Sequence, residues 1–401
     1  MRVLISAFAC EPDHGSEPEV GLQAVLAAAS RHEVWTITRE KNLPVLRAFL
    51  RDHPLRDRIH LIGLDVDGLS RRVKKRGGSV TMHWYYDLWQ RHLADAATRL
   101  DKKFDFDVAH HVTFATYWAR TGLAAVDKPF VWGPVGGGVR PPISLMRVMG
   151  LRGGSGDLIR VLSRPALAKL NGAARLARRA EVVLTQNPET AKSLGVQETA
   201  VVVPNALVVA ESIPFLDGSA RSSPLPHRII VAGRLIAWKA TSLAITAMQH
   251  IHDTNAVLEI YGEGPQRDRL DRLVAALGLT DRVRFMGVVP RTRLLSEIAC
   301  ASALVHPALH DEAGLVVAEA LAVGTPVVYL NRGGPPIVAG MWPDVPTRGV
   351  EPSSPDVTSR RIASALDAVI GSRGESTVRP TLRFTDTLLA AYDRAVVESG
   401  E

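Results

Sequence analysis

The residue types best suited to chemistry lie in His310–Glu319, where one acid, Asp311, precedes a glycine and Glu319 follows eight residues later. The apolar pattern predicts a loop and then a helix that starts beside Asp311. Backbone N–H groups in the first turn of a helix lack intrahelical acceptors and carry about half a positive charge, so they form a predicted phosphate site. Glu319, about one and a half turns into the helix, would reach a ribose, and Asp311 would reach the group attached to the phosphates. The residues expected to offer these amides are Gly314, Leu315 and Val316.

Two cations follow the predicted strand Arg228–Ala232 in one short loop. Arg234 can donate a forked pair of hydrogen bonds to a diphosphate, and Lys239 can add a point charge. Gly233 opens the loop and would let the backbone approach a ligand. A solvated basic loop is the alternative, but the acidic run downstream favours a phosphate site.

Both segments resemble motifs of one family, the retaining glycosyltransferases of family 4 (group 1 type) with the GT-B architecture. His310–Glu319 resembles the E-x7-E motif, with Asp311 in place of the first Glu. Residues 233–240 resemble G-R-L-x-x-x-K-G, with Ala240 in place of the last Gly. The resemblance implies that Glu319 binds nucleotide ribose hydroxyls and that Asp311 lies beside the donor sugar. It also implies an α/β fold of two facing Rossmann-like domains, each a parallel sheet with helices on both faces.

Two glycine-containing loops extend the resemblance. Gly262 and Gly264 lie in a Y-G-E-G-P turn that resembles the family's G-x-G-P, although a plain tight turn fits equally well. Gly15 and Ser16 follow the first predicted strand, as in the N-terminal glycine-rich loop that closes over the donor phosphates and the acceptor in the family. The alternative for this loop is a strand-to-helix turn capped by Ser16.

Two adjacent histidines, His110 and His111, end another predicted strand in a segment that resembles the family's D-x-V-H. Side chains of adjacent strand residues point to opposite faces, so we expect one imidazole to reach the ligand-binding edge and to bind sugar hydroxyls or a phosphate. The next strand leads into Gly133–Gly138, which is similar to a subgroup with G-P-V-G-G-G and lacks the cleft histidine of many members.

Short apolar runs alternate with helical stretches along the chain, which predicts parallel sheets. We expect an N-terminal acceptor-side domain over residues 1–205, a linker rich in Pro and Ser over 206–227, and a C-terminal donor domain over 228–380. A final helix at about 381–401 is expected to pack on the first domain, as in the resembled family. The predicted strands are Val3–Phe8, Glu33–Thr38, Val108–His110, Phe130–Trp132, Val182–Thr185, Ala200–Val203, Arg228–Ala232, Ala256–Tyr261, Val283–Met286, Ala303–His306 and Pro326–Leu330.

Composition is typical of a globular protein with two domains. Of 401 residues, 46% are apolar and 22% are charged. The two cysteines, Cys10 and Cys300, are too few for a disulfide framework or a zinc cluster. No run of about 18 uncharged apolar residues occurs, and the apolar start at Met1–Phe8 lacks the features of a signal peptide. We therefore expect a cytoplasmic protein.

Basic residues concentrate in the first 205 positions, which hold 29 Lys and Arg against 20 Asp and Glu. The densest clusters lie at residues 71–76 and 140–179. They form either a solvated face or a surface for anionic lipid on the inner face of the cell membrane, where each cation contributes about 1 kcal/mol. No nucleic-acid recognition motif accompanies them. Four aromatic residues near the first cluster fit a lipid interface, an acceptor pocket or the core: Trp84, Tyr85, Tyr86 and Trp89.

The resemblance implies transfer of a sugar from a nucleotide-diphosphate donor to an acceptor hydroxyl, with retention of configuration and without an obligatory metal or other cofactor. Arg234, Lys239 and the helix-opening amides would stabilise the charge on the leaving diphosphate. The D-x-D strings at Asp65–Asp67 and Asp105–Asp107 are the hints of a metal site, and such short strings often arise by coincidence. The acceptor stays open: a lipid-linked glycan, a polysaccharide or a small metabolite. Two other functions stay open as well, a nucleotide-sugar 2-epimerase and a nucleotide-sugar-binding protein without catalysis.

Overall fold

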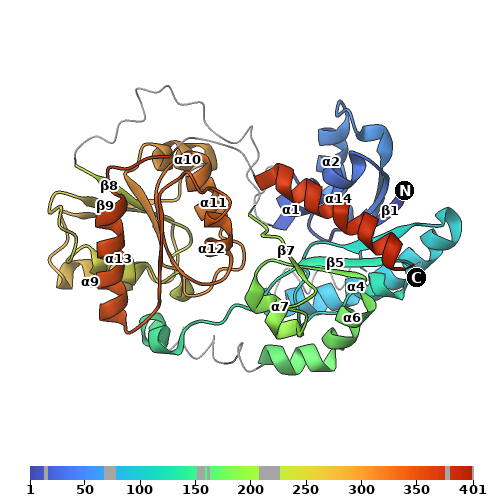
Figure 1. Cartoon of the computed structure of the whole chain (residues 1–401), viewed down its shortest axis with the longest axis horizontal. Coiled ribbons are helices and arrows are strands. Elements are labelled where there is room, and N and C mark those ends of the chain that lie inside the picture. The colour runs from blue at the N-terminus through green and yellow to red at the C-terminus, as the bar shows by residue number, and fades with distance from the viewer. Residues whose placement is uncertain are drawn as a thin grey trace. The chain divides into compact units, whose positions relative to one another are not determined.

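The computed structural model describes residues 1–12, 17–66, 78–150, 159, 163–206, 226–374 and 380–399. The chain divides into two compact units (Figure 1). Met1–Gly138, Ser163–Asn205 and Leu382–Glu401 form the first, and Val139–Leu162 and Ala206–Thr381 form the second. The expected first domain wrongly included residues 139–162. They group with the second unit because three apolar side chains of this segment are buried in its core, Leu145, Val148 and Met149.

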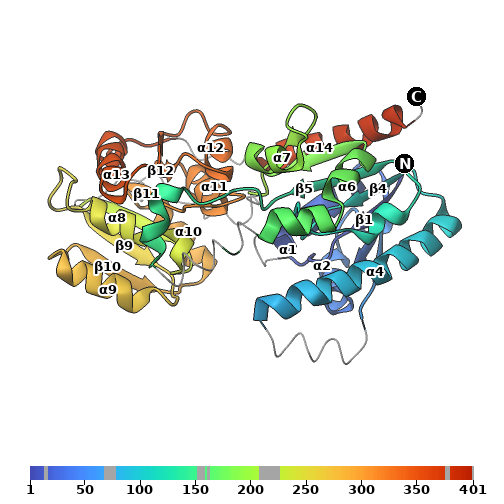
Figure 2. The ribbon, with the colours of Figure 1, turned by 90° about the horizontal axis from the view of Figure 1, so that it is seen from below.

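The first unit contains a parallel sheet of seven strands in the order β3-β2-β1-β4-β5-β6-β7. Figure 2 shows helices α4 and α14 on opposite sides of its central strands, so both faces of the sheet are covered. The strands are β1 Arg2–Ser6, β2 Glu33–Thr38, β3 Ile59–Gly63, β4 Val108–His111, β5 Phe130–Val135, β6 Val182–Thr185 and β7 Val201–Val202. The α-helices are α1 Glu17–Ala29, α2 Leu43–Leu50, α4 Gly78–Phe104, α6 Ala173–Arg179, α7 Pro188–Leu194 and α14 Pro380–Glu398. Shorter 3₁₀ turns are η1 Glu40–Asn42, η2 Arg56–Arg58 and η3 Gly122–Ala125.

The second unit contains a parallel sheet of six strands in the order β10-β9-β8-β11-β12-β13. The strands are β8 Arg228–Ala232, β9 Val257–Tyr261, β10 Val283–Gly287, β11 Ala303–His306, β12 Val327–Leu330 and β13 Thr347–Val350. The α-helices are α8 Thr241–Ala247, α9 Arg267–Ala276, α10 Arg291–Ala299, α11 Leu315–Ala322, α12 Gly334–Ala339 and α13 Pro355–Val369. The 3₁₀ turns are η4 Ile143–Met149 and η7 Ala237–Lys239.

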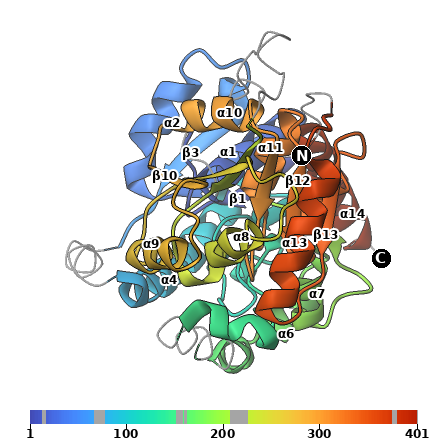
Figure 3. The same ribbon diagram turned by 90° about the vertical axis from the view of Figure 1, so that its left-hand side faces the viewer.

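Two apolar layers sandwich the second sheet, and β8 shows how the sequence builds them. Ile229 and Val231 are buried in a cluster with α8, α9 and α13. Ile230 and Ala232 are buried in a second cluster with α10, α11 and α12. Because successive strand side chains point to opposite faces, an unbroken apolar run is the signature of a strand covered on both sides. Figures 1 and 3 show α10 and α11 on one side of this sheet and α9 and α13 on the other.

The predicted fold class is confirmed, since both sheets are parallel and carry helices on both faces. Two strands were missed, β3 and β13, because their side chains are largely half-buried or exposed and give no apolar run. No helix in the described ranges is both long and apolar enough to cross a bilayer.

The strand order also predicts where a ligand binds. In the second sheet β8 is flanked by β9 on one side and by β11 on the other, so the order reverses between β8 and β11. Loops that leave such neighbouring strands run to opposite faces and open a crevice at the carboxyl ends. The loop after β8 begins at Gly233, and the loop after β11 leads through Asp311 to α11.

Candidate active site

Asp311 and Lys239 meet at the carboxyl ends of β8 and β11. The ammonium of Lys239, on η7, lies 2.7 Å from Oδ2 of Asp311. His306, the last residue of β11, places its Nε2 2.9 Å from the same oxygen. Two loops that are 72 positions apart in sequence are therefore joined by one carboxylate.

The other carboxylate oxygen of Asp311 binds the backbone amides just before α11. Oδ1 accepts hydrogen bonds from the amides of Ala313, at 3.2 Å, and Gly314, at 3.0 Å. Gly314 has φ of +73° and precedes the helix, which begins at Leu315. The expectation of three open amides is therefore wrong for Gly314, whose N–H already has an acceptor. The amides of Leu315 and Val316 remain, and the described part of the chain supplies no acceptor for either.

The charges in this cluster are well defined. Burial raises the pKa of Asp311, but the Lys239 charge and the His306 hydrogen bond outweigh it, so the pKa lies well below its usual range. Burial lowers the pKa of His306, with a further contribution from Lys239. At neutral pH an ionised Asp311 thus accepts from Lys239 and from the Nε2–H of a neutral His306. Lys239 has three N–H donors, so two are left for a ligand.

Arg234 lies exposed in the loop with Lys239, and within the described residues its guanidinium takes part in no ion pair. Gly233 has φ of +140°, a conformation that side-chain-bearing residues rarely adopt, and a Cβ there would meet only Cε of Lys239, at 3.9 Å. The loop therefore combines a backbone that a ligand can approach with the Arg234 guanidinium, which can donate two parallel hydrogen bonds to a phosphate.

Glu319 lies in the middle of α11 and is buried. Its Oε1 accepts a 2.9 Å hydrogen bond from Nε of Arg291, the first residue of α10. Burial raises the pKa of Glu319, and the Arg291 charge offsets part of that rise.

Gly262 and Gly264 have a packing role that favours the tight-turn alternative. A Cβ on Gly262 would lie 2.0 Å from the carbonyl oxygen of Gly233, and one on Gly264 would lie 2.5 Å from that of Leu235. Backbone hydrogen bonds join the same two loops, from Gly233 to Tyr261 and from Leu235 to Glu263. The glycines let the loop after β9 support the loop that carries Arg234.

His110 and His111 are both buried, so the expectation that one must reach the ligand-binding edge is wrong. His110 contacts Tyr392 of α14 and the carbonyl of Gly133, both at 2.8 Å. His111 lies on the other face, 3.0 Å from the Tyr86 hydroxyl of α4 and 3.2 Å from Ser6. A sheet covered on both faces buries both members of an adjacent pair. Burial lowers the pKa of His110 to about 4 and that of His111 to about 3, so both rings are neutral at pH 7.

The described residues of the N-terminal glycine-rich loops add no contacts to the cluster around Asp311. Gly15 and Ser16 lie outside the described residues. Gly137, with φ of +99°, faces Trp118, and a Cβ there would lie 2.0 Å from the indole; Gly138 packs equally tightly on Thr190. The glycines after β5 therefore permit close packing within the first unit.

The described acids of the two D-x-D strings each have a partner within the first unit. Asp105 pairs with Lys128, Asp107 accepts the Arg2 amide at 2.7 Å, and Asp65 accepts the Tyr85 hydroxyl. Asp67 lies outside the described residues. Across the described ranges no three His, Cys, Asp or Glu side chains are arranged to hold a metal ion.

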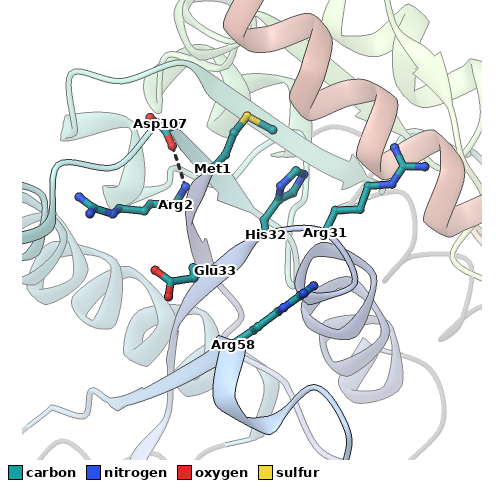
Figure 4. A pocket seen from close by; sticks show the side chains of 7 residues that line it. All are labelled: Met1, Arg2, Arg31, His32, Glu33, Arg58 and Asp107. Carbon is teal, nitrogen blue, oxygen red and sulfur yellow. Dashed lines mark hydrogen bonds between the residues drawn. The ribbon is translucent and has the colours of Figure 1, made fainter.

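A hollow of about 460 Å³ lies at the opposite, amino-terminal edge of the first sheet (Figure 4). Two of its three arginines have structural partners: Arg2 donates to the carbonyl of Phe104, at the end of α4, and Arg58 to those of Ala29 and Ser30, at the end of α1. Cations in these positions cap helices and offset their dipoles. The hollow also lies away from the carboxyl ends of the strands, where α/β sheets bind ligands.

Three features of the site escaped the sequence analysis. His306 and Arg291 take part through contacts that only the fold creates. The third is the loop Arg332–Gly334 after β12, which packs on the acidic loop. A Cβ on Gly333 would lie 2.2 Å from the carbonyl oxygen of Asp311, and the Gly334 amide donates to that oxygen at 3.0 Å. The adjacent glycines after a predicted strand were a usable signal for such a close approach.

Comparisons with known proteins agree with this geometry. Residues 219–369 match the family model of glycosyl transferases group 1. An uncharacterized glycosyltransferase of Methanocaldococcus jannaschii is 35% identical over 152 residues, 36% of each chain. The 2-deoxystreptamine glucosyltransferase of Streptomyces kanamyceticus is 30% identical over 187 residues, 44% of this chain and 47% of that protein. The chain thus matches less than half the length of each of these relatives.

Solved structures match over almost the whole chain. HepE of Anabaena, crystallised in complex with UDP, superposes with a TM-score of 0.57 at 15% identity, over 97% of this chain and all of that one. At this identity the match shows the fold alone, which is that of the GT-B glycosyltransferases. Residues 219–369 are thus similar to the group 1 glycosyl transferases, and the chain as a whole shares the GT-B fold.

Proposed function

We propose that this chain is a retaining glycosyltransferase of family 4, which moves a sugar from a nucleoside diphosphate to an acceptor hydroxyl. The observation that carries the proposal is the cluster at the switch point of the second sheet. There Asp311 joins Lys239 to the N-terminus of α11 by accepting from the Gly314 amide, and Arg234 is exposed in the same loop as Lys239. This is a set of donors and cations suited to a diphosphate, with one ionised acid to orient the attached group.

The proposed chemistry follows from charge. Cleavage of the sugar–phosphate bond leaves additional negative charge on the diphosphate. Arg234, the two unused N–H groups of Lys239 and the α11 amides would stabilise it as it develops. These groups supply the positive charge that a metal ion provides in other transferases, so we propose a reaction without an obligatory cation. The retained configuration and the front-side attack it implies rest on the family resemblance.

Relatives guide the choice of donor. The Anabaena HepE structures hold UDP, UDP with glucose, or UDP-glucose, so uridine is the first base to test. The Streptomyces relatives are named as transferring glucose or N-acetylglucosamine to 2-deoxystreptamine. We propose glycan, polysaccharide or glycolipid synthesis as the setting, with the acceptor to be identified by experiment.

Calorimetric titration with UDP, GDP and ADP, each with and without EDTA, tests the donor site. We expect one nucleotide to bind with a Kd in the micromolar range, unaffected by EDTA. In Glu319→Ala the affinity should fall by roughly 10- to 100-fold, since a hydrogen bond to a charged group contributes about 1.5–3 kcal/mol. Asp271→Ala removes an exposed acid of α9 and should bind like the wild type.

Other outcomes separate the rival functions. Binding that requires a metal would contradict the cation-independent mechanism. Donor consumption without any acceptor would favour an epimerase. Nucleotide binding without turnover on any of a panel of acceptors would favour a binding protein.

We propose further that the first unit contacts an anionic membrane surface through residues 163–179, which contain five cations and no acid. A turn at Asn171–Gly172 separates the helical residues 163–170 from α6, so the cations of this segment do not share one helical face. Arg164 is occupied, since it stacks on Trp118 at 4.3 Å. What remains outward is Lys169, Arg175 and Arg178 beside two leucines, Leu167 at 41% and Leu170 at 80% exposure.

This surface belongs to the second of the two basic clusters, residues 140–179. The block at residues 71–76 lies outside the described residues, and Tyr85, Tyr86 and Trp89 are buried in the core of the first unit. Exposed leucines among cations are typical of segments that enter the headgroup region of anionic bilayers.

Vesicle co-sedimentation tests this surface. We expect the protein to sediment with phosphatidylglycerol vesicles and to stay in solution with phosphatidylcholine vesicles. Leu167→Ser/Leu170→Ser should reduce the bound fraction several-fold, because it removes the apolar area that would be buried. Val288→Ser, which changes an exposed apolar residue of the second unit, serves as the control. Equal sedimentation of the double variant and the control would refute the proposed surface.

A further inference from the structure

The buried carboxylate of Glu319 is held by one specific partner. Glu319 is 6% exposed, and its Oε1 accepts from Nε of Arg291 at 2.9 Å. Burial alone raises the pKa of this carboxyl, and Arg291 is the group that opposes the rise. An ionised carboxylate at this depth requires such a partner, because an unpaired buried charge is strongly destabilising.

Arg291 occupies a position that its own helix disfavours. It is the first residue of α10, and the first turn of that helix contains no acid. A cation at a helix N-terminus is repelled by the positive end of the helix dipole. Arg293, in the same turn, pairs with Glu297 of its own helix at 3.7 Å. Arg291 instead reaches across to α11, so the pair with Glu319 compensates for its unfavourable position.

Glu319 and Arg291 both have polar atoms that make no hydrogen bond within the described residues. Oε2 of Glu319 accepts no hydrogen bond within the described residues. It is in contact with solvent, because it does not belong to the fully buried polar atoms that lack a partner. The Nη groups of Arg291 likewise have no acceptor in the described part of the chain. An oriented carboxylate oxygen that reaches solvent can accept hydrogen bonds from a hydroxyl pair of a ligand.

We propose that Arg291 is a positioning residue that fixes the Glu319 carboxylate for the vicinal 2′- and 3′-hydroxyls of the donor ribose, and so determines selectivity for ribonucleotides. This inference rests on the proposed function, which supplies the nucleotide. It goes beyond that function by assigning the selectivity to a pair of helices rather than to Glu319 alone. A freely rotating carboxylate would accept from one hydroxyl or from water, whereas a carboxylate locked at Oε1 presents Oε2 in one direction.

The test compares a nucleoside diphosphate with its 2′-deoxy form by calorimetry, using UDP and dUDP if uridine is the preferred base. We expect wild-type protein to bind the ribonucleotide roughly 10- to 100-fold more tightly, the effect of one hydrogen bond to a charged group. In Arg291→Ala this ratio should collapse to about 3-fold or less. Arg291→Lys, which keeps the charge but changes the geometry, should restore part of the ratio. Arg293→Ala removes a cation from the same helical turn and should leave the ratio unchanged.

Each outcome has a distinct meaning. An unchanged ratio in Arg291→Ala, or an equal loss of affinity for both nucleotides, would overturn the inference and leave the proposed function standing. Wild-type binding without discrimination would overturn it as well. No binding of any nucleotide to the wild type would overturn the proposed function and this inference together. Thermal unfolding of the variants separates a lost ratio from a lost fold.

Discussion

Lys239→Ala is expected to lower the rate of donor cleavage by about 10²- to 10³-fold, the range seen when one preorganised donor to a developing oxyanion is removed. In the described part of the chain one ammonium N–H donates to Asp311 and the other two have no acceptor, so they are available to a diphosphate. The charge is most valuable when the diphosphate departs, so kcat should fall more than the affinity for the free nucleotide. Release of nucleoside diphosphate from the nucleotide sugar, followed at saturating donor, measures the effect.

The fold should survive this change. Lys239 lies on a short 3₁₀ turn with a quarter of its side chain exposed, and Asp311 keeps three other hydrogen bonds without it. Lys192→Ala removes an exposed lysine from α7 of the first unit and should retain full turnover. Turnover of Lys239→Ala within about twofold of that control would contradict the role of this lysine in stabilising the departing diphosphate.

Central strands were predictable because their apolar runs are unambiguous. Arg228–Ala232 and Ala303–His306 were predicted with the bounds that the structure gives, since both faces of each strand are covered. β3 and β13 lie at the edges of their sheets, and most of their side chains are half-buried or exposed. A histidine interrupts the apolar residues of β3, and β13 begins with two polar residues, so no long apolar run marks either strand. The same two-sided burial that made central strands visible misled the reading of the histidines, since a covered sheet buries adjacent side chains on both faces.

The candidate site was predictable only where local sequence determines it. Asp311 and Lys239 sit in loops next to a strand or helix, and motif and spacing identified both. The pairing of Asp311 with His306 and with the Gly314 amide could not be read from the sequence, because it depends on how the loop folds back on the helix start. The role of Arg291 could not be predicted from the sequence for a related reason. Its contact with Glu319 spans 28 positions and joins two helices, and no spacing rule connects them.

Asp311→Asn is expected to lower turnover by about 10²-fold or more and to destabilise the protein by about 1–3 kcal/mol. The amide oxygen of asparagine can still accept from Ala313 and Gly314. Its NH₂ group, however, would face the Lys239 ammonium and the Nε2–H of His306, so three donors would meet without an acceptor. Lys239 would lose its counter-ion and move, and the donor site would lose its geometry. Turnover and urea unfolding at pH 7 measure the two effects.

The dependence of stability on pH distinguishes loss of charge from loss of shape. Because the pKa of Asp311 in the folded protein lies well below its usual value near 4, its ionised form stabilises the folded state above about pH 4. This contribution is lost as the pH falls toward the folded-state pKa. The difference in stability between the wild type and Asp311→Asn should therefore be constant above about pH 5 and shrink below about pH 4. Asp268→Asn, which changes an acid of α9 outside the cluster, is the matched control. A difference that does not shrink in acid would mean that the asparagine acts through its shape, and that the ionised carboxylate does not hold this site together.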